Sequence, residues 1–368
     1  MGGCVVQSVD LEAEESRLSA TAAAGATPRF RPLRVERVVA ETADAVSLVL
    51  DVPGEGEAFR YRAGQFVTFR VVIDGVAHQR SYSMSSSPSV DADLQVTVKR
   101  VPGGLVSNWL LDSIGAGDVV DVSPPTGSFV LDETAPEIVA FAAGSGITPI
   151  FSILKAALAG PRPRVRLLYA NRDRASVIFA AELEELAARH AQRFTALFHL
   201  DDESGFVDRA EIAELTGGPR DAVFYVCGPT EFMATVQRSL VDLGIGDSRI
   251  HIERFTPWDA PAEAEAAAPA PAAEGEATPV EVTIRLGGRT VTVAHRPGTT
   301  ILQTVRFAGL RPPSSCETGT CATCMAQVVE GHAVMRNNEA LTPEEVAAGW
   351  VLTCQAEPAS PTVHVVYE

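Results

Sequence analysis

The chain of 368 residues carries a net charge of −17 and is 46% hydrophobic. At roughly 100 to 200 residues per domain, this length predicts two or three domains, and we expect three. No uninterrupted apolar stretch approaches the roughly 18 residues that a membrane span needs, so no membrane span is expected. Nucleic-acid binding requires clustered Lys and Arg, so the acidic balance argues against a nucleic-acid partner.

The first residues and the cysteines bear on the cellular compartment. Residues 1–28 are rich in Ala, Glu and Ser without a sustained period, which predicts a mobile leader. They lack the basic start and the apolar run of a secretory signal, and Val6 replaces the Ser or Thr of a myristoylation motif. Four of the six cysteines form one C-terminal pattern rather than a secreted disulfide framework. We therefore expect a cytoplasmic protein with reduced thiols.

Two domains are predicted ahead of a linker. Residues 29–133 contain short alternating segments broken by Gly and Pro at turn-like spacing, which predicts an antiparallel β-barrel. In residues 134–256 apolar strands alternate with helices, which predicts a parallel α/β sheet. The expected strands of this second domain are 138–143, 165–170 and 222–226, and its expected helices are 150–158, 180–189 and 231–243.

A proline-rich segment separates these two domains from a third. Residues 257–278 alternate Ala, Pro and Glu, a composition that forms a semi-extended linker. In the last domain, residues 279–368, two short strands flank Gly287 and Gly288, which predicts a hairpin. Residues 299–308 predict a short helix directly before a cysteine-rich loop.

A polar tetrapeptide follows a strand-like run in the first domain. Arg80 can pair with a phosphate, and Tyr82 can stack near an isoalloxazine ring. Ser81 and Ser83 supply hydroxyl groups, and Ser83 could form a hydrogen bond at the edge of such a ring. An ordinary barrel strand with an exposed arginine explains these four residues equally well, so the neighbouring motifs decide between the two interpretations.

Two glycine loops are predicted to lie against phosphates. The segment Gly103-Gly104-Leu105-Val106-Ser107 opens a helix predicted over 107–111, whose amide groups would cradle a pyrophosphate. The alternative there is a plain turn with a helix N-cap. The segment Gly144-Ser145-Gly146-Ile147-Thr148-Pro149 follows an apolar strand, and its glycines permit a tight turn beside a dinucleotide phosphate. Because Pro149 departs from the Rossmann pattern G-x-G-x-x-G, this loop alone is no such fingerprint.

Two further segments of the second domain are candidates for nucleotide contacts. Cys227-Gly228-Pro229 ends an apolar strand, where open parallel sheets bind ligands, although a small buried side chain explains Cys227 equally well. The segment Tyr169-Ala170-Asn171-Arg172 is predicted to place polar groups at an adenosine ribose. Arg172 or Arg174 would meet a 2′-phosphate if NADPH is the donor. Exposed arginines are often simply solvated, so the choice between NADH and NADPH stays open.

The most specific pattern in the sequence is formed by four cysteines. Cys316, Cys321 and Cys324, followed at a distance by Cys354, have the C-x4-C-x2-C…C spacing with which plant-type proteins hold a 2Fe–2S cluster. Small residues between them would let backbone amides approach the sulfurs. Structural zinc is the alternative, but zinc sites usually pair two closely spaced cysteine units, and Cys354 has no near cysteine partner.

Taken in order, these motifs resemble the ferredoxin-NADP reductase superfamily. Its FAD barrel carries R-x-Y-S and a later G-x-x-S/T loop, and its nucleotide domain carries G-x-G-I-T-P and C-G-P. The resemblance implies that Arg80, Tyr82 and Ser83 bind the flavin, and that Gly104 and Ser107 lie against its pyrophosphate. It also places the C-G-P motif near the nicotinamide and Phe255 near the flavin ring. The segment after the linker resembles a β-grasp ferredoxin.

The whole arrangement is similar to reductase components of multicomponent oxygenases, including phenylacetyl-CoA and 3-ketosteroid hydroxylase systems. This resemblance implies an NAD(P)H-dependent oxidoreductase that passes electrons through FAD and the 2Fe–2S cluster to a terminal oxygenase, hydroxylase or desaturase. No general acid or base is required of the protein, because the cofactors carry the reaction. Two alternatives stay open: a general reductase of acceptors such as cytochrome c, oxygen or a hybrid-cluster (HCP-type) protein, and a redox-sensing module with little turnover.

Overall fold

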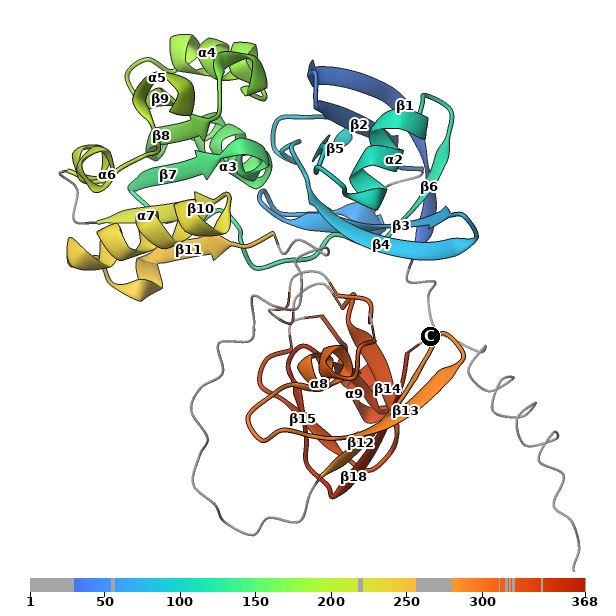
Figure 1. Ribbon diagram of the computed structural model, residues 1–368. Coiled ribbons are helices and arrows are strands. Elements are labelled where there is room, and N and C mark those ends of the chain that lie inside the picture. The colour runs from blue at the N-terminus through green and yellow to red at the C-terminus, as the bar shows by residue number, and fades with distance from the viewer. Residues whose placement is uncertain are drawn as a thin grey trace, which may run out of the picture.

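The computed structural model describes residues 30–53, 57–217, 221–255, 280–310, 312–314, 317, 319, 322–338 and 340–367. Its strands and helices fall into three groups (Figure 1). The predicted leader 1–28 and the predicted linker 257–278 lie outside the described residues. Within the described residues, no helix is long and apolar enough to cross a membrane.

The first group is an antiparallel barrel, as predicted. Its six strands have the order β4-β3-β6-β1-β2-β5, and a bridge between Met84 and Val96 joins the two edges of the sheet. Strand β2 places Leu48 and Leu50 in the barrel core, and β5 adds Val96 and Val98. The elements are β1 (Arg31–Thr42), β2 (Ala45–Asp51), β3 (Phe66–Ile73), β4 (Val76–Ser83), β5 (Leu94–Lys99), α2 (Leu105–Ser113) and β6 (Val119–Val122).

The second group is a parallel sheet with the strand order β11-β10-β7-β8-β9. Alternate side chains of a strand point to opposite faces. Ile138 and Leu167 therefore pack with α3 and α4 on one face, and Val139 and Leu168 pack with α6 and α7 on the other. The strands are β7 (Glu137–Ala143), β8 (Arg164–Asn171), β9 (Phe194–Leu200), β10 (Ala222–Cys227) and β11 (Ile250–Glu253). The helices are α3 (Ile147–Ala159), α4 (Ala180–Arg189), α5 (Asp201–Ser204), α6 (Arg209–Thr216) and α7 (Thr230–Asp242).

The third group is a small mixed sheet covered by helix α8. Its strand order is β13-β12-β18-β14-β16, in which β12 and β18 run parallel. Ile301 and Val305 of α8 pack against Val282 and Val365 of the sheet. The elements are β12 (Glu281–Leu286), β13 (Arg289–Ala294), α8 (Ile301–Phe307), β14 (Met325–Glu330), β15 (Ala333–Met335), α9 (Pro343–Ala347), β16 (Trp350–Leu352), β17 (Ala356–Pro358) and β18 (Thr362–Val366).

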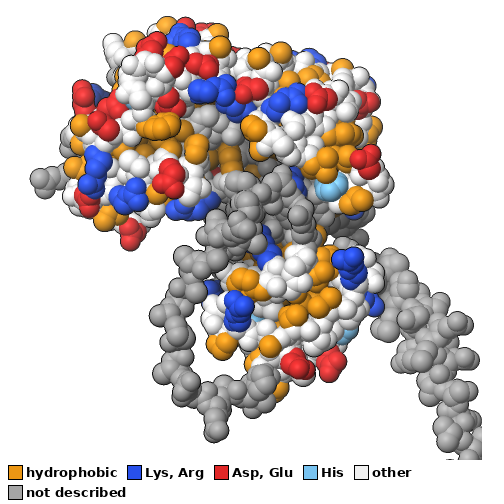
Figure 2. Space-filling model, in the orientation of Figure 1, with side chains coloured by type: hydrophobic (Ala, Val, Ile, Leu, Met, Phe, Trp, Pro, Cys, Tyr) orange, Lys and Arg blue, Asp and Glu red, His pale blue; other side chains and the backbone are white. Residues whose placement is uncertain are grey.

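The local predictions agree with these elements apart from some ends. Gly287 and Gly288 both have positive φ, 55° and 75°, and join β12 to β13 in the predicted hairpin. Helix α2 begins at Leu105, before its predicted start at Ser107, because extended Gly104 is the N-cap. In the view of Figure 2, Lys and Arg side chains are intermixed with Asp and Glu over the first two groups.

Candidate cofactor sites

A cavity of about 230 Å³ gathers residues from the barrel and from the parallel sheet. Its lining comes from the C-terminal ends of β4 and β5, the start of α2, the loop between β7 and α3 with the first turn of α3, and Phe255. Nine predicted site residues line it, namely Arg80, Ser81, Tyr82, Ser83, Gly104, Val106, Ser107, Thr148 and Phe255. Segments that are far apart in sequence, and that were each assigned to flavin or nucleotide from separate motifs, therefore meet in one place.

Strand β4 presents the tetrapeptide at the cavity. The ring of Tyr82 packs against Phe69 with a centroid distance of 5.3 Å, and burial raises the pKa of its hydroxyl above the usual value. Ser83 is buried at the strand end. The Arg80 guanidinium donates to the Gln79 carbonyl at 2.8 Å. An aromatic ring, hydroxyl groups and a cation thus share one wall, which is the donor set that a flavin nucleotide needs.

The start of α2 forms a second wall. Gly103 has a φ of 73°, and a Cβ on Gly104 would lie 2.8 Å from Ser107 Oγ and 2.9 Å from Val101 Cβ. The Ser107 hydroxyl accepts a hydrogen bond from the Val101 amide at 3.1 Å. Among the described residues, no side chain caps the first amides of the helix. These amides and the positive end of the helix dipole therefore suit a phosphate group.

In the loop between β7 and α3, the backbone requires glycine at two positions. Gly144 has a φ of 53°, and a Cβ on Gly146 would lie 2.2 Å from the Cys227 carbonyl oxygen. A Cβ on Gly228 would lie 2.9 Å from Ala143 Cβ. The structure thus brings the G-x-G-I-T-P and C-G-P segments into direct backbone contact. Among the residues of this loop, Ser145 and Thr148 reach the cavity.

Eight predicted site residues are not part of the cavity lining. They are Gly144, Gly146, Pro149, Asn171, Arg172, Cys227, Gly228 and Pro229. Cys227 is fully buried in the core, where burial and then the nearby Glu253 raise the pKa of its thiol well above the ordinary value. This environment favours the interpretation of Cys227 as a small buried side chain.

The end of β8 carries a buried amide that forms no hydrogen bond to the described residues. Asn171 is 3% exposed, and neither polar atom of its side chain forms a hydrogen bond to them. It interacts electrostatically with the Tyr169 hydroxyl without reaching hydrogen-bond geometry. Buried polar groups normally find partners, so an unpaired amide at this sheet edge is suited to a bound nucleotide. Arg172 is exposed and its Nε donates to Asp173 at 3.0 Å.

Sequence reasoning missed Thr97, Lys99 and Val101 of the lining, and it included Leu105 and Ser145 only as members of the two glycine loops. Lys99 matters most among them, because it and Arg80 are the two cations of the described cavity lining. Its Nζ lies 3.9 Å from where a Cβ on Gly144 would be. The available signal was the alternation in β5, where Thr97 and Lys99 interrupt buried Val96 and Val98 with polar groups.

Two of the four predicted cluster ligands can be placed. Cys324 and Cys354 are buried in one group with Leu302, Leu341 and Leu352. Cys316 and Cys321 lie outside the described residues. Around them, Glu317, Gly319 and Ala322 have positive φ values of 54°, 87° and 53°. Such left-handed residues turn the backbone sharply, as a loop that folds around a cluster must.

The side chain of Gln355 contacts the sulfur of Cys354, a predicted cluster ligand. The Gln355 amide lies 3.7 Å from Cys354 Sγ and donates to the Glu317 carbonyl at 2.6 Å. Donors to cluster sulfurs favour the reduced, more negative state. We expect Gln355→Met to lower the reduction potential of the cluster by tens of millivolts, measured by redox titration monitored with electron paramagnetic resonance. Gln327→Met, whose amide donates to the Ala348 carbonyl, is the control. An unchanged or raised potential in Gln355→Met would contradict this role.

Comparison with known protein families gives three matches along the chain. The oxidoreductase FAD-binding domain matches residues 32–131, and the oxidoreductase NAD-binding domain matches residues 141–238. The 2Fe–2S iron–sulfur cluster binding domain matches residues 284–359. Each match falls on one of the three groups of elements, and the third is a 2Fe–2S domain over the segment that contains the four cysteines.

Several relatives align with nearly the whole chain. The ferredoxin reductase component of 3-ketosteroid-9-alpha-monooxygenase from Rhodococcus rhodochrous is 37% identical, over 89% of this chain and 94% of the relative. A component of 1,2-phenylacetyl-CoA epoxidase from Escherichia coli is 32% identical, over 92% and 98%. Among solved structures, phthalate dioxygenase reductase aligns with a TM-score of 0.59 at 25% identity, over 92% of this chain and 98% of that chain.

The fold and the cofactor domains define an FAD- and NAD(P)H-dependent oxidoreductase with a 2Fe–2S ferredoxin domain. More narrowly, the chain belongs to the family of reductase components that transfer electrons to a partner oxygenase. When bound, FAD and the nicotinamide would supply the hydride-transfer and one-electron chemistry themselves. The contribution of the chain is to hold and orient these groups.

Proposed function

We propose that the chain is the NADH-dependent reductase component of a terminal oxygenase, with an oxygenase of the 3-ketosteroid type as the first partner to test. The likeness to the Rhodococcus rhodochrous reductase, 37% identical over nearly its whole length, supports this partner class. The observation that carries the activity is the single cavity in which the flavin motif, the G-x-x-S loop and the nucleotide loop meet. A cytoplasmic location is part of the proposal, and a cluster pattern built from thiolates supports it.

The roles of the individual residues follow from their positions. Arg80 and the uncapped start of α2 at Gly104 and Ser107 would neutralise the flavin pyrophosphate, while Tyr82 and Ser83 would hold the ring. Thr148 in the lining, and beside it Gly144, Gly146, Pro149 and the segment Cys227-Gly228-Pro229, would form the nicotinamide side. Asn171 would meet the nucleotide ribose. Cys316, Cys321, Cys324 and Cys354 would bind the cluster. The domains proposed around these sites are 29–133, 134–256 and 279–368.

We expect NADH to be preferred over NADPH by about 10-fold in kcat/KM, because the arginines beside the nucleotide edge are already occupied by carboxylates. Arg172 contacts Asp173 at 3.0 Å and Asp44 at 3.9 Å, and Arg174 contacts Glu184 at 2.5 Å. A 2′-phosphate would have to displace these carboxylates against their charge. The measurement is the initial rate of ferricyanide reduction with each donor.

A matched pair of variants tests the cause of this preference. Asp44→Asn should narrow the gap between the two donors, since it removes one negative charge near Arg172. Asp74→Asn, in the turn between β3 and β4, is the control, because asparagine tolerates the positive φ found there. A wild-type protein that reacts faster with NADPH would refute the proposed donor.

The activity itself is tested by an anaerobic absorption spectrum with iron and sulfide analysis. Adding NADH should bleach the flavin and cluster bands together. Adding the purified oxygenase together with its substrate and oxygen should then restore both bands and yield hydroxylated product in proportion to the NADH consumed. Rapid reduction of cytochrome c without any coupling to an oxygenase would favour a general reductase, and slow bleaching would favour a redox sensor.

A further inference from the structure

If the chain has the proposed function, the overall reaction leaves one proton to be removed from the flavin cavity. NADH gives up a hydride, which is two electrons and one proton. Both electrons leave one at a time through the 2Fe–2S cluster, so NADH yields NAD⁺, two electrons and one proton. Part of the cavity wall is buried, with Ser83, Thr97 and Ser107 each at most 7% exposed, so hydroxyl groups of the protein are in place to take up that proton.

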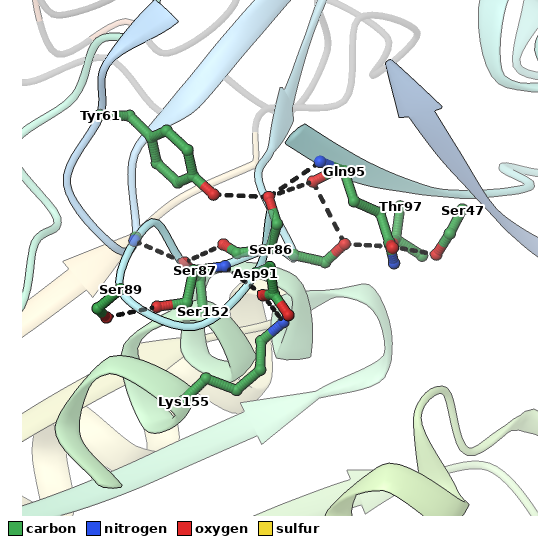
Figure 3. A network of polar contacts seen from close by, with 12 residues as sticks. Ser47, Tyr61, Ser86, Ser87, Ser89, Asp91, Gln95, Thr97, Ser152 and Lys155 are labelled. Atoms are coloured by element: carbon green, nitrogen blue, oxygen red, sulfur yellow. Dashed lines mark hydrogen bonds and ion pairs between the residues drawn. The ribbon is translucent and has the colours of Figure 1, made fainter. Parts of the chain in front are cut away.

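A row of buried hydroxyl groups begins in this wall. Thr97 lines the cavity, and its Oγ1 lies 2.7 Å from Ser47 Oγ on the neighbouring strand β2 (Figure 3). Ser47 Oγ in turn lies 2.5 Å from Glu41 Oε1 near the end of β1. Ser47 is fully buried, Thr97 is 4% exposed, and Glu41 is only partly buried. The row therefore leads from the cavity toward a carboxyl group nearer the surface.

These hydroxyls lie on the outer face of the barrel, toward the parallel sheet. Ser47 and Thr97 are direct partners in the register of β2 and β5. Their neighbours in sequence, Leu48 and Val96, point into the barrel core instead. Ala45, on the same face of β2 as Ser47, packs in the core of the second domain. The row thus runs along the interface between the two domains.

The donor and acceptor capacity of each group gives the row a direction. A hydroxyl has one donor and two acceptor sites, whereas an ionised carboxylate only accepts. When Glu41 is ionised, Ser47 must donate to it, and Thr97 then donates to Ser47. Thr97 keeps acceptor capacity, of which the Ser85 hydroxyl at 2.7 Å can use one site. The second site can accept from the cavity that Thr97 lines.

We propose that Thr97, Ser47 and Glu41 form a proton relay that carries the hydride-derived proton from the flavin cavity to the groove between the two domains. A proton arriving at Thr97 forms a new O–H bond there, and the old Thr97 proton passes to Ser47. The old Ser47 proton passes to the Glu41 carboxylate. Each hydroxyl ends with one proton as before, and Glu41 gains one, which it then releases to water.

The surroundings of Glu41 suit a temporary proton acceptor. Burial raises the pKa of Glu41, while the hydrogen bond from Ser47 lowers it. Of the charged groups that face it, Glu182 of α4 raises the pKa and Lys155 of α3 lowers it. Lys155 also pairs with Asp91. Asp91, Lys155 and Glu182 line a groove of about 350 Å³. Glu41 is itself partly exposed and interacts electrostatically with Lys155 and Glu182 at this groove.

The same hydroxyls also stabilise the barrel, so the test needs variants that separate the two roles. Glu41→Gln keeps a partner for Ser47 but cannot accept a proton at neutral pH. Ser47→Ala and Thr97→Val interrupt the row, and Thr97→Ser restores it. Tyr61→Phe is the control, because it removes a half-buried hydroxyl outside the row. Tyr61 contacts Ser86, and Ser86 is connected to Ser85 only through the Gln95 carbonyl, which has no proton to pass on (Figure 3).

The experiment follows proton release from the holoprotein. Protein reduced with one equivalent of NADH is mixed anaerobically with ferricyanide in weak buffer containing a pH-indicator dye. We expect release to slow by about 100-fold in Glu41→Gln, Ser47→Ala and Thr97→Val, the lower end of what a positioned proton-transfer group contributes. Thr97→Ser and Tyr61→Phe should match the wild type. Time-resolved infrared spectra should show a protonated carboxyl band that rises and decays, and that is missing from Glu41→Gln.

Two results would overturn the relay. One is wild-type proton release in Glu41→Gln together with an unchanged carboxyl band. The other is equal slowing in all five variants, Tyr61→Phe included, in step with their melting temperatures, which would indicate a purely structural role. Bleaching of the flavin by NADH is recorded in the same samples. If the wild type does not bleach, the proposed function fails, and if it bleaches but the variants release protons normally, only the relay fails.

Discussion

Replacing Cys354 with serine is expected to lower electron delivery to the oxygenase by more than about 100-fold, while NADH-dependent reduction of ferricyanide at the flavin continues. Loss of a group that only supports a metal ligand lowers metal affinity or activity 10- to 100-fold, and loss of a thiolate ligand itself lowers them further. Cys354 is buried beside Cys324 in the third domain. The residues that line the flavin cavity belong to the first two domains, between Arg80 and Thr148 and at Phe255. The measurements are the iron content, the resonance signal of the reduced cluster, and coupled product formation.

The control for this prediction is Cys4→Ser, the same chemical change at a cysteine outside the C-x4-C-x2-C…C pattern. It should retain iron and coupled activity. A Cys354→Ser protein that still holds two irons per chain and supplies the oxygenase at the wild-type rate would remove Cys354 from the ligand set.

Adding one methyl group at Gly146 is expected to disable the nicotinamide side of the site. The new Cβ would lie 2.2 Å from the Cys227 carbonyl oxygen and 2.7 Å from the Gly228 amide nitrogen. Both are backbone atoms that cannot rotate away, so β10 and the start of α3 must separate. We expect Gly146→Ala to lower the free energy of unfolding by about 2 kcal/mol, as overpacking typically does. The shifted loop should slow flavin reduction by NADH by about 100-fold.

Gly246→Ala provides the matched control, since no atom lies within 4 Å of a Cβ at that position. Stopped-flow reduction of the flavin and thermal melting should leave it close to the wild type. Wild-type kinetics in Gly146→Ala would show that the contact between the two glycine motifs does not position the nucleotide.

Much of this protein was predictable from short stretches of the sequence. The apolar runs of β7, β8 and β10 identified a parallel sheet, because a strand between two helical layers must be apolar on both faces. The paired glycines at 287 and 288 identified the hairpin, because its turn requires positive φ at both positions. The cysteine spacing identified the cluster, since its ligands must leave a short loop in a set order.

Other features depend on how strands that are distant in sequence come together. The alternation in β5 puts Thr97 and Lys99 on one face of the strand, but nothing local shows that this face lines the cavity, or that Ser47 is the partner of a residue 50 positions away. Nor does the sequence decide that Cys227 is buried, or show that the Asn171 amide forms no hydrogen bond to the described residues. The local motifs are read from bond geometry and periodicity within a few residues. Barrel closure and the packing of the two domains decide which side chains line the cavity together. They set the register between β2 and β5 and the face that each strand turns toward the neighbouring domain.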